Sequence, residues 1–138
     1  MQTQKKNRDR KSLLIIVLYL TALHSLFVGI GLLVQLPALM DWMGFGKIEQ
    51  PFFPAQGGVF HLLMAVAYFF AARHPERHQI IIQFIIILKI SATVFLMFYF
   101  ILIDPILMVL LSGLSDGTMA LLILLLWRSY QNTLHKEA

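Results

Sequence analysis

The fold is decided by residues 12–40, which read SLLIIVLYLTALHSLFVGIGLLVQLPALM and contain no Asp, Glu, Lys or Arg. A helix needs about 20 predominantly apolar residues to cross the hydrocarbon layer of a membrane. The apolar part of a cleaved signal peptide is shorter, at roughly 7–15 residues. We therefore expect a retained transmembrane helix at about residues 13–36 rather than a signal peptide.

The composition of the whole chain points the same way. Of its 138 residues, 59% are hydrophobic and only 13% are charged, and the mean hydropathy is +0.77. Soluble domains carry about 25% charged residues, and a chain this small has too little interior to hide so much apolar surface. These values exclude a soluble enzyme, a disordered chain and a repeat solenoid. The lack of cysteine excludes disulfides and cysteine-ligated metals.

Three further apolar runs follow the first. Pro37, Pro51 and Pro54 interrupt the helical pattern and predict an interfacial loop after the first span. The sequence thus predicts a single all-α membrane domain over residues 1–138, folded as a four-helix bundle. Its spans are expected at about 13–36, 55–72, 79–102 and 105–127, with polar tails at 1–12 and 128–138.

The basic residues predict how these spans are oriented. Four spans place both termini and the loop at 73–78 on one side of the membrane, and nine of the eleven Lys and Arg residues lie there. Because basic residues concentrate in cytoplasmic loops, both termini are expected in the cytoplasm. No basic stripe exists that could follow a phosphate backbone, so the expected partner is the lipid bilayer and not nucleic acid.

Each predicted span carries one His or charged residue near its middle, namely His24, His61, Lys89 and Asp116. They lie ten to twelve residues from the cytoplasmic ends of their spans, which is about 15–18 Å at ~1.5 Å per helical residue. That depth is close to the middle of a hydrocarbon layer about 30 Å thick. Ionisable groups inside a membrane are costly and are functional candidates by default.

Helical spacing places polar or small residues on the same faces as these four. A GxxxG pair at Gly113 and Gly117 would let another helix approach closely. The predicted midplane pocket, for ligand binding or proton transfer, comprises His24, His61, Lys89, Asp116, Thr21, Tyr68, Gln83, Thr93 and Ser112.

Two interpretations of the midplane residues stay open at this point. Lys89 and Asp116 lie at matching depth on consecutive antiparallel spans, so we expect them to form an ion pair. The network could serve only to fix helix packing, since polar groups hold membrane helices together. Alternatively, it forms a functional pocket, because four such residues at one level are more than packing requires.

Three functions fit such a pocket. The first is a non-enzymatic membrane subunit or binding protein that holds a lipid, a quinone-like molecule or a partner. The second is a proton-coupled transporter or channel protomer, with Asp116 as proton carrier and Lys89 as its counter-charge. The third is a redox protein with His24 and His61 as axial ligands of haem b. No catalytic motif and no zinc-binding HExxH motif occurs, and no HxxxH spacing lies within the predicted spans. The first function, a non-enzymatic protein without a cofactor or metal, is therefore the expected one, and haem b is an alternative.

Roughly the last two-thirds of the chain resembles a known group of proteins. The carrying features are the Gly-rich start of the second span at residues 57–58, the turn AARHPERH at 71–78, Lys89 and Asp116. In these the chain is similar to DoxX-like and BphX-like small four-helix bacterial membrane proteins. The resemblance implies a multi-pass protein of the bacterial inner membrane. It also implies association with a larger membrane or redox complex. Association with further copies of the chain is expected for the transporter function, since four short spans rarely enclose a pathway alone.

Overall fold

The computed structural model describes the backbone of residues 2–137 and the side chains of residues 8–132. Helix accounts for every regular element in this part of the chain, and four of the helices are long and apolar enough to cross a membrane. This is the pattern of a multi-pass membrane protein. The elements are α1 (Gln2–Val34), α2 (Pro37–Trp42), α3 (Phe52–Arg73), α4 (Gln79–Leu102) and α5 (Leu107–Glu137).

The helices match the expected spans closely and extend beyond some of them. The third span was expected at 79–102, and α4 has these bounds. Both predicted polar tails continue the helices, because residues 2–12 and 128–137 contain no Gly or Pro and are rich in helix-forming Lys, Arg and Gln. Helix α3 starts three residues before the expected position. Pro54 does not delay it, since the first turn of a helix needs no backbone N–H there.

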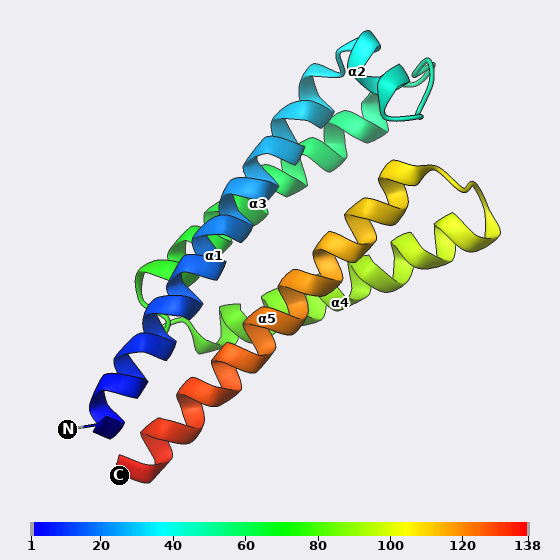
Figure 1. Cartoon of the computed structure of the whole chain (residues 1–138). Helices are drawn as coiled ribbons and strands as arrows, with labels where there is room; N and C mark the ends of the chain where they lie inside the picture. Colours follow the sequence, from blue (N-terminus) through cyan, green and yellow to red (C-terminus); the bar gives the residue numbers. More distant parts are fainter. Residues whose placement is uncertain (1, 138) are drawn as a thin grey trace.

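The helices pair into two antiparallel hairpins, α1 with α3 and α4 with α5 (Figure 1). Glycines allow both close approaches. A methyl group added at Gly29 of α1 would lie 2.9 Å from the backbone oxygen of Gly58 on α3. A methyl group at Gly117 of α5 would lie 3.2 Å from Cγ2 of Thr93 on α4. The predicted GxxxG of α5 therefore faces α4, as small residues at membrane-helix contacts do.

The two hairpins pack together at the end of the molecule where α1 begins and α5 ends (Figure 1). Polar contacts join the helices there: Arg10 donates to the backbone oxygen of Ser129 at 3.1 Å, and Lys11 lies 3.2 Å from Glu76. Beneath them lies one apolar core to which all four long helices contribute. Its buried members are Leu14, Leu18, Ala22, Tyr68, Ala71, Ala72, Ile82, Ile85, Ile86, Ile123, Trp127 and Tyr130.

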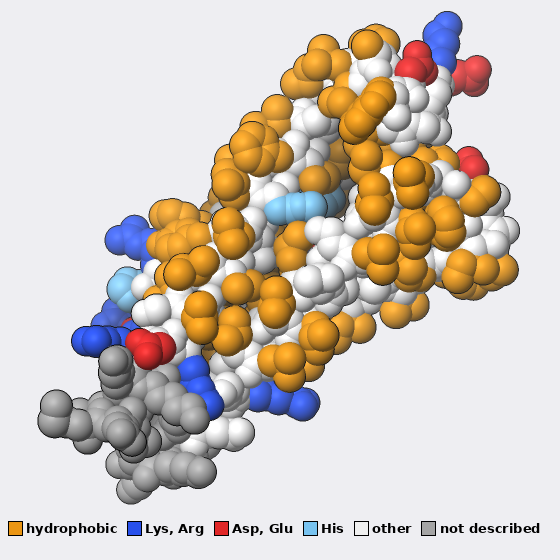
Figure 2. Space-filling view, in the orientation of Figure 1, with side chains coloured by type: hydrophobic (Ala, Val, Ile, Leu, Met, Phe, Trp, Pro, Cys, Tyr) orange, Lys and Arg blue, Asp and Glu red, His pale blue; other side chains and the backbone are white. Residues whose placement is uncertain are grey.

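Toward the other end the hairpins diverge (Figure 1). Figure 2 shows a hollow between them in this half, with a histidine side chain at its edge. The loops at the far ends of the hairpins still meet, because a methyl group at Gly44 would lie 3.3 Å from Cγ2 of Ile106. The hollow therefore opens on the side of the molecule. Apolar side chains cover this outer surface and would face lipid.

Candidate functional site

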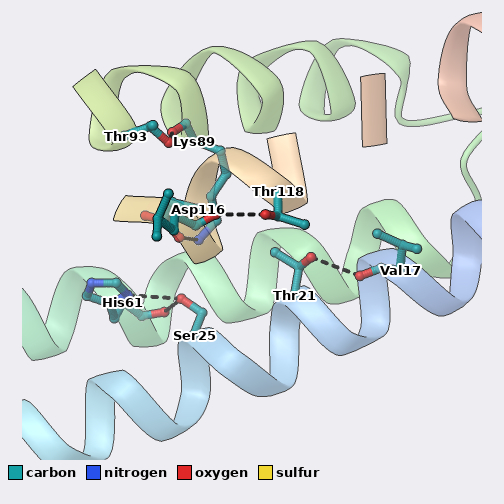
Figure 3. A network of polar contacts seen from close by, with 9 residues as sticks. Val17, Thr21, Ser25, His61, Lys89, Thr93, Asp116 and Thr118 are labelled. Atoms are coloured by element: carbon teal, nitrogen blue, oxygen red, sulfur yellow. Dashed lines mark hydrogen bonds and ion pairs between the residues drawn. The ribbon is translucent and has the colours of Figure 1, made fainter. Parts of the chain in front are cut away.

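The candidate site lies where the closed half of the molecule meets the open half. Its central feature is the expected ion pair, in which Lys89 of α4 donates to Oδ1 of Asp116 on α5 (Figure 3). The Lys89 side chain is 2% exposed and that of Asp116 is 11% exposed. Each charge is therefore shielded from the solvent or lipid around the protein, and it is compensated by the other charge, as burial of a charge requires.

Tyr68 of α3 packs against this pair. Its side chain is 1% exposed, and Nζ of Lys89 lies 5.7 Å from the centroid of its ring. An ammonium at this distance from an aromatic face is attracted by the ring quadrupole. Lys89 thus connects the two hairpins, because it bonds to α5 and rests against α3.

Ser25 of α1 and His61 of α3 form a second polar contact at this level (Figure 3). The Ser25 hydroxyl lies 2.9 Å from the backbone oxygen of His61 and 3.2 Å from its Nδ1 atom. Gly29 follows Ser25 by one turn, so the close approach of α1 and α3 brings the serine within reach of the histidine backbone. The contact fixes the position of the Nδ1 edge of the imidazole ring.

His24 lies at the edge of the site and is half-buried. Both histidines are within electrostatic range of Lys89 and Asp116, and His61 is also within range of His24. Within the described residues, His24 makes no side-chain hydrogen bond, and the Nε2 atom of His61 has no partner. His61 thus lies near the Lys89–Asp116 pair (Figure 3), and His24 is within electrostatic range of the same pair.

The unpaired nitrogens reach the molecular surface. Among the described residues, no fully buried side-chain nitrogen or oxygen lacks a hydrogen-bond partner. An atom that is half-hidden and unpaired must therefore be accessible from outside, and this applies to Nε2 of His61 and to the ring nitrogens of His24. These atoms can bind a molecule that enters the hollow without breaking any existing hydrogen bond.

The remaining predicted residues take different places. Thr21 and Thr93 lie beside the site, but each hydroxyl donates to the backbone oxygen four residues earlier in its own helix, at 2.8 Å. Ser112 is half-buried, one turn from Asp116. The prediction for Gln83 is wrong, because its side chain is exposed on the outer surface while the neighbouring Ile82 and Ile85 fill the core.

The face of α1 that was expected to point inward differs from the observed buried face by a rotation about the helix axis. The expected polar face of α1 contained Thr21 and His24, whereas the buried face contains Thr21, Ser25 and Gly29. Gly31 has open space beside it. Sequence reasoning therefore missed Ser25. The spacing of Thr21, Ser25 and Gly29, four residues apart and all small, was the signal that could have identified this face.

Metal ligation is limited by the geometry of the site. Among the residues described, no three His, Asp or Glu side chains lie close enough to hold a metal ion together.

Comparisons of the chain with protein-family models, with curated proteins and with solved structures find no match. Chemically, the site offers a neutralised charge pair, a neighbouring aromatic ring and accessible imidazole nitrogens.

Proposed function

We propose that the chain is a four-helix bundle of the bacterial inner membrane, with both termini in the cytoplasm. The distribution of basic residues supports this orientation. The start of α1, the 74–78 loop and the end of α5 lie at one end of the molecule, and the basic residues are concentrated in these segments. The resemblance of residues 57–127 to DoxX-like and BphX-like proteins is part of the same proposal.

We further propose that the protein is a non-enzymatic membrane subunit or binding protein. It would hold the polar group of a lipid-, quinone- or partner-derived molecule between the hairpins. The observation that carries this proposal is the set of accessible, unpaired imidazole nitrogens of His24 and His61 at membrane depth. A purely structural polar layer would satisfy these groups internally, because an unpaired polar atom in an apolar layer is costly.

The arrangement favours binding over a proton path through one chain. A path would require polar or hydrated groups on both sides of Asp116. On the side toward the chain ends, the layer is followed by a closed apolar core that includes Leu18, Ile85 and Ile123. The hollow in Figure 2 lies on the other side, between the diverging hairpins. A bound molecule would therefore enter from the bilayer.

The test is mass spectrometry of molecules that remain with the protein after extraction in mild detergent. We expect one species at near-stoichiometric amount with the wild-type protein and its loss in His24→Leu. The matched control is Gln83→Leu, the same kind of change on a side chain that faces outward. Circular dichroism would show that all three proteins retain their helices. Equal amounts of the species in all three, or only bulk lipid in each, would contradict the proposal.

A further inference from the structure

The contact between Ser25 and His61 determines the direction of the Ser25 hydroxyl hydrogen and which ring nitrogen of His61 carries a hydrogen. The Ser25 side chain is buried at 1% exposure, and its oxygen has two neighbours, the backbone oxygen of His61 at 2.9 Å and Nδ1 of the same residue at 3.2 Å. A hydroxyl has one hydrogen to donate and can accept others. The backbone oxygen can only accept, whereas an imidazole nitrogen can do either.

Only one assignment satisfies both contacts. Two oxygens 2.9 Å apart repel each other unless a hydrogen lies between them, and the carbonyl has none to supply. The hydroxyl hydrogen of Ser25 must therefore point to the backbone oxygen of His61. The remaining contact then requires Nδ1 of His61 to carry a hydrogen and donate it to Ser25.

This assignment fixes the character of the other ring nitrogen. An uncharged imidazole has one N–H, so Nε2 carries a lone pair when Nδ1 carries the hydrogen. Nε2 of His61 has no partner among the described residues and reaches the molecular surface. Ser25 thus makes His61 present a hydrogen-bond acceptor at the molecular surface, at a depth where water is scarce.

We propose that this site selects an amphiphile whose head group donates a hydrogen bond, such as a long-chain alcohol or phenol, through Nε2 of His61. The inference rests on the proposed binding function and narrows its ligand. A head group that only accepts hydrogen bonds, such as an ether, would meet the lone pair of Nε2 with its own lone pair. Ser25 acts here as a positioning residue, since it holds the tautomer and does not itself contact the ligand.

The tautomer is tested directly by nitrogen-15 NMR of protein with labelled histidine, in which the His61 signals are those lost in His61→Asn. We expect a protonated Nδ1 and an unprotonated Nε2 in the wild type. Ser25→Ala should give a mixture of both tautomers, and Ser25→Thr, which keeps the hydroxyl, should restore the wild-type spectrum. A hydrogen on Nε2 of the wild-type protein, in a neutral or a charged ring, would overturn the inference.

Ligand preference is tested with two probes that differ in one group, 4-dodecylphenol and its methyl ether, by titration of the purified protein in detergent. The phenol should bind about three- to tenfold more tightly, the range that one hydrogen bond supplies, and this ratio should fall toward one in Ser25→Ala. Equal binding of both probes to the wild type would overturn the donor preference and leave the binding function standing. Failure of both probes, together with no retained species in mass spectrometry, would count against the binding function itself.

Discussion

Removal of one partner of the Lys89–Asp116 pair should destabilise the protein far more than removal of both. Both side chains are nearly buried, at 2% and 11% exposure, and each is the other's ionic partner. Breaking a buried pair from one side leaves an uncompensated charge and costs about 3–5 kcal/mol. Replacing both groups by neutral groups of similar size is often close to neutral.

The variants that express this contrast are Asp116→Asn, Lys89→Met and the double substitution. Each single change should lower the free energy of unfolding by about 3–5 kcal/mol, or about two to three and a half powers of ten in the folded-to-unfolded ratio. The double variant should recover most of this loss. The matched control is Thr118→Val, because the Thr118 hydroxyl is exposed and bonds only to its own helix, and it should change stability by less than about 0.5 kcal/mol.

The assay is unfolding of the purified protein by sodium dodecyl sulfate in mixed micelles, followed by far-ultraviolet circular dichroism. The double-mutant cycle isolates the interaction between the two residues. Single losses below about 1 kcal/mol that simply add in the double variant would match an exposed pair. That result would refute the argument that the pair is withdrawn from solvent at the junction of the hairpins.

Three further predictions concern packing, orientation and pH. Gly29→Ala should destabilise by about 1–3 kcal/mol because its methyl group meets the α3 backbone, whereas Gly31→Ala, with open space beside it, should be neutral in the same unfolding assay; equal effects would contradict the packing. The chain lacks cysteine, so a membrane-impermeant maleimide should label Glu49→Cys in intact spheroplasts but Arg77→Cys only after lysis; the reverse pattern would invert the proposed orientation. The pKa of Glu76 is lowered, first by a hydrogen bond from its own backbone N–H and then by Lys11. Its small stabilisation, of the order of 0.2–1 kcal/mol for an exposed pair, should be present above the ordinary glutamate pKa and vanish as pH falls through the lowered one, and Glu76→Gln should remove this pH dependence of stability.

The relative level of the midplane residues along their helices could be predicted from the sequence, because it depends only on counting residues from the ends of an apolar run. The same counting predicted that Lys89 and Asp116 would meet. Rotation about the helix axis was harder to predict. In α4 nearly every residue is apolar, so the polarity pattern carries little contrast. Gln83, a polar residue, faces outward while isoleucines occupy the core.

Small residues marked the buried face where polarity did not. On α5, Gly113, Asp116 and Ala120 follow one buried stripe at three- and four-residue spacing. The corresponding stripe on α1 passes through Ser25 rather than His24. No local sequence pattern could predict that the two hairpins diverge, because this depends on how α1 and α3 together pack against α4 and α5.

The polar layer therefore divides into two chemically distinct parts, and this division bears on whether it is structural or functional. Lys89 and Asp116 satisfy each other, and Thr21 and Thr93 are satisfied by their own helices. Groups of this kind fix helix packing and need no ligand. His61 differs, because Ser25 uses one ring nitrogen and leaves the other unpaired and accessible at the molecular surface. Packing explains the first part of the layer completely. It gives no reason to leave an acceptor open at the depth where an unpaired polar atom is most costly, and a molecule from the bilayer that donates a hydrogen bond supplies that reason.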